Sequence, residues 1–211
     1  MEGVLDILFP PHCVSCGGFG SWWCSHCRSL VEAPRALSLV DLDGFVALGM
    51  YHDPVLRAVV HGLKYRGGTC LLPYLEFFAE SRLKELAIPW EDHASIGIQH
   101  LPTDPSRERE RGFDQAEILA KTVSPFLHTQ VTLLNALIRF DSRGAQAKLE
   151  DPELRRANAQ GVYRLQTTKL PEAVVLIDDV ATTGASMGAA AQVLREAGVQ
   201  KVYGFALAIG A

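Results

Sequence analysis

The sequence predicts an α/β protein in which a largely parallel sheet carries helices on both faces, preceded by a small cysteine-rich segment. Short β-branched apolar runs such as Val174–Ile177 alternate with amphipathic helical stretches after residue 41, which is typical of βαβ units. Four cysteines lie close together within the first 40 residues. Two adjacent carboxylates, Asp178 and Asp179, end one apolar run and precede small, hydroxylated residues. Ligands of parallel sheets bind at such strand ends, so these carboxylates are the first candidates for a site.

Length and composition indicate a globular protein. A chain of 211 residues holds one ordinary domain and a small appendage, and 48% hydrophobic with 21% charged residues is typical of that class. The formal charge of −4 argues against a broad nucleic-acid-binding face. No apolar run approaches the roughly 18 residues that a membrane span needs. The acidic start of the chain lacks the pattern of a signal peptide, so we expect a cytoplasmic protein with reduced thiols.

The cysteine cluster predicts a zinc site. Four of the five cysteines form two Cys-x-x-Cys pairs seven residues apart, a spacing by which turns aim thiolates at one tetrahedral zinc ion. The four are Cys13, Cys16, Cys24 and Cys27. A pair of reducible disulfides is the alternative, and His12 or His26 could replace one cysteine as a ligand. Because the protein would supply all four ligands, we expect a structural zinc ion rather than a catalytic one.

The cysteine-rich segment is predicted to be a separate unit that depends on its metal. About 30 residues cannot bury enough apolar surface to fold alone, and metal binding can supply the missing stability. We expect Trp22 and Trp23 to pack this unit, although an exposed aromatic residue could also stack on nucleic-acid bases. Cys70 stands apart and is expected to be a small buried residue. The predicted domains are therefore residues 1–40, with an N-terminal helix and the zinc ribbon, and residues 41–211.

The elements of the larger domain follow from periodicity and end signals. Asp53 is a predicted N-cap before Pro54, and the helix that follows turns Val55 and Leu63 to one face and Lys64 to another. Gly198 is the predicted end signal of a helix that begins near Ala185. Further helices are expected at residues 72–86 and 115–126. Strands are expected at residues 45–51, 95–101, 133–140, 161–165, 174–178 and 201–208. Polar residues 141–156 are expected to form a mobile loop.

The segment around residues 178–186 predicts a site for ribose phosphate. Paired carboxylates suit two vicinal hydroxyls, or a hydrated Mg²⁺ beside them. Gly184 allows the backbone N–H groups of the following turn to approach a ligand, and the start of a helix favours an anion such as a phosphate. The alternative is an ordinary turn after a Rossmann-like strand. The segment lacks the glycine and lysine pattern of a Walker A loop and the glycine pattern of a dinucleotide site.

This segment resembles the phosphoribosyl pyrophosphate signature of type I phosphoribosyltransferases. Over nearly the whole chain, four features also occur in one order: the two cysteine pairs, Leu63–Tyr65, Arg111–Ala116 and the ribose-phosphate signature. This layout is similar to that of the ComF family of competence-associated proteins, including its close relative GntX. The resemblance implies the type I phosphoribosyltransferase fold with an N-terminal zinc ribbon.

The resemblance also implies roles for individual residues. Asp178 and Asp179 would bind the ribose hydroxyls and act as the catalytic carboxylates. The 5′-phosphate would be held by Ala181, Thr182, Thr183, Gly184, Ala185 and Ser186. Thr103 and Asp104 would form the turn that grips pyrophosphate, with Arg107 and Arg111 beside it, since guanidinium groups suit phosphate oxygens. The alternative for these arginines is a charged helix start. Residues 139–156 would form the loop that closes over the site.

Two positions depart from the family pattern. Most relatives have a Pro-Val-Pro-Leu-like turn where this chain has Leu101-Pro102-Thr103-Asp104, and most have Asn where it has Asp114. The second change replaces a donor amide by a carboxylate that only accepts. Asp104 and Asp114 are conceivable general bases.

Three functions remain open from the sequence. The first is a phosphoribosyltransferase that binds phosphoribosyl pyrophosphate with Mg²⁺ and acts in natural transformation on incoming single-stranded DNA. The second is a non-catalytic adaptor or ligand sensor of the DNA-uptake machinery on the same fold. The third is a nucleotide-salvage phosphoribosyltransferase. The resemblance implies a competence helicase or a recombination mediator as partners, with the zinc ribbon as the docking element.

Overall fold

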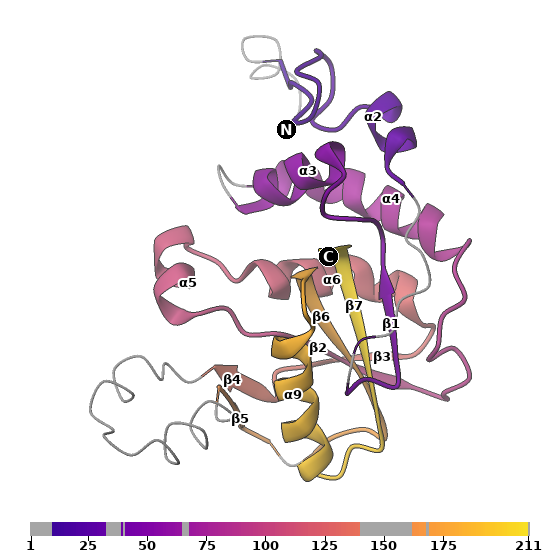
Figure 1. Ribbon diagram of the computed structural model, residues 1–211, viewed down its shortest axis with the longest axis vertical. Helices are drawn as coiled ribbons and strands as arrows, with labels where there is room; N and C mark the ends of the chain where they lie inside the picture. Colours follow the sequence, from indigo (N-terminus) through magenta and orange to yellow (C-terminus); the bar gives the residue numbers. More distant parts are fainter. Residues whose placement is uncertain are drawn as a thin grey trace.

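A five-stranded parallel sheet forms the centre of the molecule. The computed structural model describes residues 10–32, 39, 41–64, 68–139, 162–167 and 169–210. The sheet has the order β1–β7–β6–β2–β3, and all four strand pairings are parallel. Its strands are β1 (Gly44–Ala47), β2 (Ile96–His100), β3 (Val131–Leu134), β6 (Ala173–Ala181) and β7 (Lys201–Ile209). Figure 1 shows their arrangement, and it confirms the predicted α/β class.

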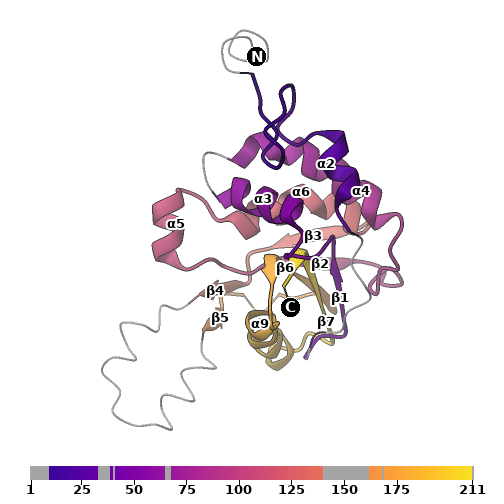
Figure 2. The same cartoon turned by 45° about the horizontal axis from the view of Figure 1, so that its top comes forward.

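Helices cover both faces of this sheet, as Figure 2 shows. The main helices are α3 (Pro54–Lys64), α4 (Leu72–Leu83), α6 (Gln115–Leu127) and α9 (Ala185–Glu196). In β6, Val175 and Ile177 belong to the core shared with α3, α4 and α6, whereas Val174 and Leu176 belong to the core shared with α9. All four side chains are fully buried. The strand is apolar without interruption because both of its faces are covered.

The predicted end signals of the helices are confirmed. Asp53 Oδ1 accepts hydrogen bonds from the backbone N–H groups of Val55 at 2.8 Å and Leu56 at 3.2 Å, so it caps α3. Gly184 precedes α9 with φ of 76°, and Gly198 follows it with φ of 99°. Both values lie in the left-handed region, where glycine is the least strained residue.

The cysteine-rich segment packs directly on the larger domain through α2 (Ser25–Leu30) and Trp23. Trp23 is fully buried, and its ring centroid lies 4.9 Å from that of Phe78 in α4. The guanidinium of Arg28 lies 5.2 Å from the ring centroid of Phe77, also in α4. Trp22 is 36% exposed, so only one of the two tryptophans is a buried packing residue. The segment therefore shares the main core, although the predicted boundary at residue 40 stays a prediction.

The order of the strands creates a switch point between β2 and β6. The chain runs from β2 through α6 to β3 on one side of this boundary, and from β6 through α9 to β7 on the other. The two crossover helices lie on opposite faces of the sheet, so the connections at the carboxyl ends of β2 and β6 diverge. Such a divergence leaves a crevice that is the usual ligand site of parallel α/β sheets.

Three segments differ from the prediction. The expected strand at 133–140 is two strands, because β3 ends at Leu134 and β4 (Leu137–Arg139) pairs with β5 (Tyr163–Leu165) in a separate antiparallel sheet. The backbone N–H of Ala136 donates to Gln99 Oε1 at 2.7 Å, which fixes the turn between β3 and β4. A short helix, α5 (Pro105–Arg111), follows β2. Cys70, in the 3₁₀ turn Gly68–Leu71, is partly exposed rather than buried.

Residues 1–9, the start of the segment for which an N-terminal helix is predicted, and the predicted loop at 141–156 lie outside the described residues. No helix of the described residues is long and apolar enough to cross a membrane.

Candidate functional site

A cavity of about 410 Å³ lies at the switch point between β2 and β6. β2 and β6 are paired up to His100 and Ile177, and the backbone N–H of Leu101 donates to the Ile177 carbonyl at 2.8 Å. The turn after β2 therefore lies beside the two carboxylates of β6. The cavity is lined by Tyr51, Lys64, Leu101, Pro102, Thr103, Asp104, Gln115, Ala116, Arg139, Tyr163, Asp178, Asp179, Val180, Thr182 and Ser186.

Asp178 and Asp179 line this cavity within the last part of β6, which extends beyond the predicted strand end to Ala181. Asp178 Oδ1 accepts a hydrogen bond from the N–H of Asp179 at 2.8 Å, and Asp179 Oδ1 accepts one from the N–H of Val180 at 2.8 Å. Burial, and then the neighbouring charge of Asp179, raise the pKa of Asp178 well above its ordinary value. A raised carboxylate pKa in a cavity is typical of a functional site.

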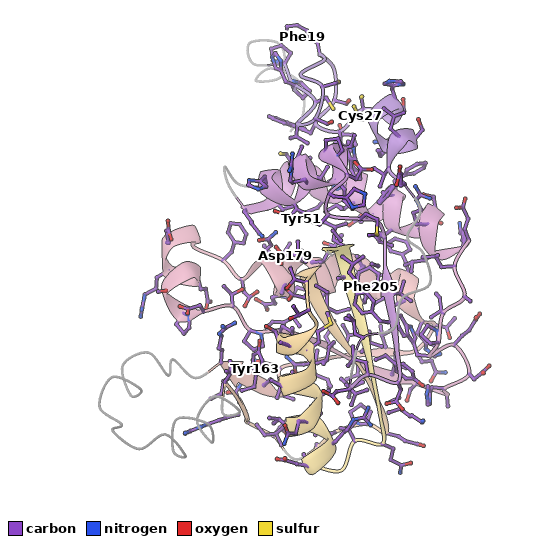
Figure 3. All side chains as sticks on the ribbon, viewed as in Figure 1. Phe19, Cys27, Tyr51, Tyr163, Asp179 and Phe205 are labelled. Carbon is purple, nitrogen blue, oxygen red and sulfur yellow. The ribbon has the colours of Figure 1, made fainter. Side chains whose placement is uncertain are left out.

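Lys64, the last residue of α3, forms an ion pair with the second carboxylate. Its Nζ lies 2.9 Å from Asp179 Oδ2, and the two side chains are 23% and 17% exposed. Lys64 also lowers the pKa of Asp178, but less than burial and Asp179 raise it. Figure 3 labels Asp179 near the tips of β6 and β7, with Tyr51 close by. The basic face of α3 thus reaches the cavity through Lys64.

The six residues predicted to hold a 5′-phosphate divide between two places. Thr182 and Ser186 line the cavity with the carboxylates. Thr183, Gly184 and Ala185 line a second groove of about 690 Å³ beside α9. Ala181 is buried in the core that α9 covers. The structure therefore brings the hydroxyl groups of Thr182 and Ser186, rather than the whole segment, to the cavity that the carboxylates line.

Thr103 and Asp104 also line the cavity, and Asp114 holds this turn in place. Asp114 Oδ2 accepts from the N–H of Thr103 at 2.8 Å, while its Oδ1 accepts from the N–H of Ala116 at 2.9 Å as the cap of α6. Asp104 Oδ1 accepts from the N–H of Ser106 at 2.9 Å as the cap of α5. Because both oxygens of Asp114 accept, an asparagine here would have to present its amide to one donor. Asp114 thus serves as a helix cap that fixes the turn.

Arg107 and Arg111, also predicted to bind pyrophosphate, are residues of the helix α5. Their position is compatible with the alternative that they belong to a charged helix. Their side chains lie outside the part of the chain that the structure describes.

Several cavity residues were not among the sequence candidates, namely Tyr51, Lys64, Gln115, Arg139 and Tyr163. The guanidinium of Arg139 lies 5.9 Å from the ring centroid of Tyr163, and burial raises the pKa of Tyr163, so its phenol stays protonated at neutral pH. Lys64 ends a basic helix stripe, Gln115 lies in the Arg111–Ala116 motif, and Arg139 begins the segment expected to close over the site, whereas Tyr51 and Tyr163 gave no sequence signal. These two come from elements that only the tertiary fold brings together.

The four predicted metal ligands are gathered at the N-terminal segment. The Sγ atoms of Cys13, Cys16, Cys24 and Cys27 all lie within 4.8 Å of one another, and none forms a disulfide. The Sγ atoms of Cys16 and Cys24 are 3.8 Å apart. A tetrahedral zinc ion with Zn–S bonds of about 2.3 Å places its sulfur atoms about 3.8 Å apart, so this arrangement fits the ion. The four cysteines can therefore hold a metal ion, as the spacing predicts.

The electrostatics of the cluster also suit a metal. Burial raises the pKa of the Cys13 thiol, but backbone N–H donors outweigh it and lower the pKa to about 6. Burial and its sulfur neighbours raise the pKa of Cys27 to about 12. One thiolate is thus ready for a metal at neutral pH, whereas Cys27 is expected to lose its proton only when the ion binds.

Comparison with known proteins identifies relatives over most of the chain. The chain is 26% identical to Competence protein F of Haemophilus influenzae, over 94% of this chain and 84% of that protein. It is 29% identical to DNA utilization protein YhgH of Escherichia coli O157:H7, over 72% of this chain and 66% of the relative. These two relatives support membership of the ComF family. No family model matches this chain.

One solved structure is also similar to this chain, that of the AQ2163 protein from Aquifex aeolicus. The two share 12% identity with a TM-score of 0.37, over 78% of this chain and 86% of that one.

Proposed function

We propose that this protein binds phosphoribosyl pyrophosphate with Mg²⁺ in the cavity between β2 and β6, and that it acts in natural transformation as a phosphoribosyltransferase. The observation that carries the proposal is the joint position of Asp178, Asp179, Thr182 and Ser186 in one cavity at the switch point of a parallel sheet. Two relatives are named Competence protein F and DNA utilization protein YhgH, and these names support the proposed cellular role. Incoming single-stranded DNA, with a helicase or recombination mediator, is the proposed setting.

The carboxylates suit the ribose. Asp178 and Asp179 each accept a hydrogen bond from a backbone N–H with one carboxylate oxygen. The second oxygen of Asp178 would accept a hydrogen bond from a ribose hydroxyl. The hydroxyls of Thr182 and Ser186, near the start of α9, suit the 5′-phosphate, because N–H groups and the helix dipole favour an anion there. Lys64 would exchange its ion pair with Asp179 for the pyrophosphate once the ligand enters.

The proposed reaction is displacement of pyrophosphate from C1 of the ribose by a nucleophile. The bond between C1 and the pyrophosphate oxygen breaks with its electron pair leaving on oxygen, positive charge develops on the ribose ring, and a lone pair of the nucleophile forms the new bond to C1. Mg²⁺, bound with the substrate, would neutralise the departing charge. Asp178 and Asp179 would favour the developing positive charge, and Lys64 the leaving anion, so the rate would come from electrostatics and positioning. Asp104 and Asp114 cap helices with the oxygens described above, so we assign neither as general base.

The cysteine cluster would hold one structural zinc ion. The convergent Sγ atoms and their separations support this assignment. Because Trp23 is buried against Phe78, the metal would also order the surface that covers α4. This surface would be the docking element of the proposed DNA-uptake partners.

The test is calorimetric titration of the zinc-loaded protein with phosphoribosyl pyrophosphate, with and without Mg²⁺, and with ribose 5-phosphate for comparison. We expect Mg²⁺-dependent binding that Asp178→Ala with Asp179→Ala abolishes, because both ribose carboxylates are gone. A matched control replaces Glu91 and Asp92, an adjacent acidic pair that is exposed and outside the cavity, by alanine. The control should bind as the wild type does. Absence of binding at millimolar ligand would reject the proposed donor site and favour an adaptor without turnover.

The cellular role is tested separately by transformation frequency. Replacing the chromosomal gene by the variant with both carboxylates changed to alanine should lower the frequency to that of a deletion. A variant that transforms normally while failing to bind the ligand would separate the DNA-uptake role from the cavity.

A further inference from the structure

The helix α3 lies between the cysteine cluster and the cavity, and it contacts residues of both. Figure 1 shows it between the N-terminal segment and the tips of β6 and β7. Its last residue, Lys64, pairs with Asp179 through Nζ and Oδ2 at 2.9 Å. Its buried face belongs to the same core as Cys13 and Cys27, two of the four candidate metal ligands. One helix of 11 residues, about 16 Å long, therefore joins the two candidate sites.

The contact near the end of α3 is made by Val14, which lies between the first two cysteines. A Cβ atom added to Gly62 would lie 3.4 Å from Val14 Cγ1 and 3.9 Å from Val14 Cβ. Val14 therefore packs against the helix at the point where a side chain of residue 62 would begin. Gly62 precedes Lys64 by two residues, so this contact lies in the last turn of α3.

The position of Val14 depends on the cysteine cluster. Its N–H donates to the carbonyl of Trp22 at 3.0 Å, which joins the loop of the first cysteine pair to the chain just before the second pair. The four Sγ atoms lie within 4.8 Å of one another and no disulfide links them. Thiols are weak hydrogen-bonding groups, so a metal ion held by all four would fix this loop far more firmly than the free thiols do.

The start of α3 is held in a different way. Asp53 caps the helix with Oδ1, and its Oδ2 accepts from the N–H of Glu32 at 3.1 Å, in the chain that follows α2. Asp53 is buried, so these hydrogen bonds are shielded from water. The first turn of α3 thus has its own polar anchor, whereas Val14 and the ion pair of Lys64 act on the last turn. A change in the metal site should therefore be felt mainly at the end of α3 that reaches the cavity.

We infer that metal binding at the four cysteines and ligand binding in the cavity are coupled through α3. With the metal site filled, Val14 is held against Gly62 and Lys64 stays beside Asp179. With the site empty, the last turn of α3 moves more freely, and a ligand that needs both side chains binds more weakly. The inference rests on the proposed function for the identity of the ligand, and it adds a regulation of that site. Couplings of this kind are typically about 5–150-fold in affinity and act in both directions.

The first test measures affinity for phosphoribosyl pyrophosphate with Mg²⁺ by calorimetry, in full-length proteins with equal zinc content. Val14→Ala removes two methyl groups at the contact with α3 and keeps all four cysteines. We expect it to bind the ligand at least fivefold more weakly than wild type. The matched control is Val193→Ala, the same truncation at another half-buried valine, which packs in the core shared with α9. The control should bind within twofold of wild type.

A second measurement needs no ligand. Hydrogen exchange followed by mass spectrometry reports local opening of the backbone, here at the amides of residues 61–64. We expect these amides to exchange at least fivefold faster in zinc-loaded Val14→Ala, and in wild type stripped of zinc, than in zinc-loaded wild type. The amides of α9 should exchange at the same rate in zinc-loaded Val14→Ala and wild type, because α9 covers the other face of the sheet.

Three results would overturn the inference. The first is equal exchange at residues 61–64 in zinc-loaded Val14→Ala and wild type, and the second is equal affinity of these two proteins for the ligand. The third is a zinc-free wild type in which α9 is accelerated as much as α3, because the metal would then stabilise the whole fold. If zinc-loaded wild type binds no ligand, the proposed function is rejected. The exchange at residues 61–64 then supports or overturns, by itself, the hold of the metal site on α3.

Discussion

Asp178→Asn should make the ligand-free protein more stable at neutral pH. In the wild type, two carboxylates and one ammonium group lie together at the end of β6. Lys64 forms its ion pair with Asp179, so the charge of Asp178 has no ion-pair partner among the described residues. Burial and the charge of Asp179 raise the pKa of Asp178, so keeping it ionised costs folding free energy. The substitution removes that charge, and the amide oxygen can still accept the hydrogen bond from the N–H of Asp179 at 2.8 Å.

The expected gain is modest but measurable. Removing an unfavourable charge while keeping its hydrogen bond is a form of charge optimisation, which commonly yields up to about 2 kcal/mol, so we expect a stabilisation of about 1–2 kcal/mol. For a chain of this size each kcal/mol moves the unfolding midpoint by about 2–4 °C, which gives a rise of roughly 2–8 °C. Most single substitutions destabilise, so a rise is diagnostic of a carboxylate kept for binding.

The pH dependence of the stability difference between Asp178→Asn and wild type tests whether the carboxyl group of Asp178 is the cause. A carboxyl group whose folded pKa is raised destabilises the protein fully above that folded pKa, and the cost disappears as pH falls below the unfolded value of about 4. The advantage of Asp178→Asn over wild type should therefore shrink steadily between neutral pH and pH 4.5. Circular dichroism at several pH values, with denaturant unfolding as a second method, measures it.

Asp43→Asn is the matched control, because the same substitution should act in the opposite direction. Burial raises the pKa of Asp43, but hydrogen bonds from the N–H of Val202 and from Lys201 and Arg195 outweigh it and lower the pKa to about 2. This stabilisation is fully present above pH 4 and is lost as pH falls toward 2. The variant should lose about 2 kcal/mol at neutral pH. If Asp178→Asn destabilises as Asp43→Asn does, or if its advantage does not change with pH, the reasoning on the carboxylate pair is wrong.

The remaining predictions concern the N-terminal cluster and the turn before α9. Metal analysis should find about one zinc ion per chain, and Cys27→Ser should lose it; a metal-free protein with linked thiols would refute the zinc assignment. Trp23→Ala should destabilise the protein by about 3–5 kcal/mol in denaturant unfolding, because the fully buried ring leaves a cavity against Phe78; a change below 1 kcal/mol would show that the segment is not part of the core. Gly184→Ala should lower the free energy of unfolding by about 1–2 kcal/mol, because φ is 76° and the added Cβ would lie 3.2 Å from the side chain of Leu39. Unchanged stability would contradict this reasoning.

Periodicity and end signals predicted much of the fold because they reflect local physics. The apolar run before Asp178 is continuous because both faces of β6 are covered, and Asp53 before Pro54 marks the start of α3. These signals lie within a few residues of the feature they predict. The two Cys-x-x-Cys pairs likewise carry their own geometry, and the structure gathers all four sulfur atoms.

What the sequence did not predict depends on contacts between distant segments. The turn between β3 and β4 is held by the hydrogen bond from the N–H of Ala136 to Gln99. The two residues are far apart in the sequence, so no local sequence pattern predicts this contact. The sequence leaves Asp114 as a conceivable general base, but in the structure its Oδ1 caps α6 by accepting from the N–H of Ala116 and its Oδ2 accepts from the N–H of Thr103.

The most direct test of the central claim is a crystal structure of the protein with Mg²⁺ and phosphoribosyl pyrophosphate. We predict that the ribose hydroxyls lie within hydrogen-bond distance of Asp178 and Asp179, that the 5′-phosphate lies by Thr182 and Ser186, and that Lys64 has left Asp179 for the pyrophosphate. A ligand bound elsewhere, or a cavity between β2 and β6 that stays empty at saturating ligand, would contradict the account.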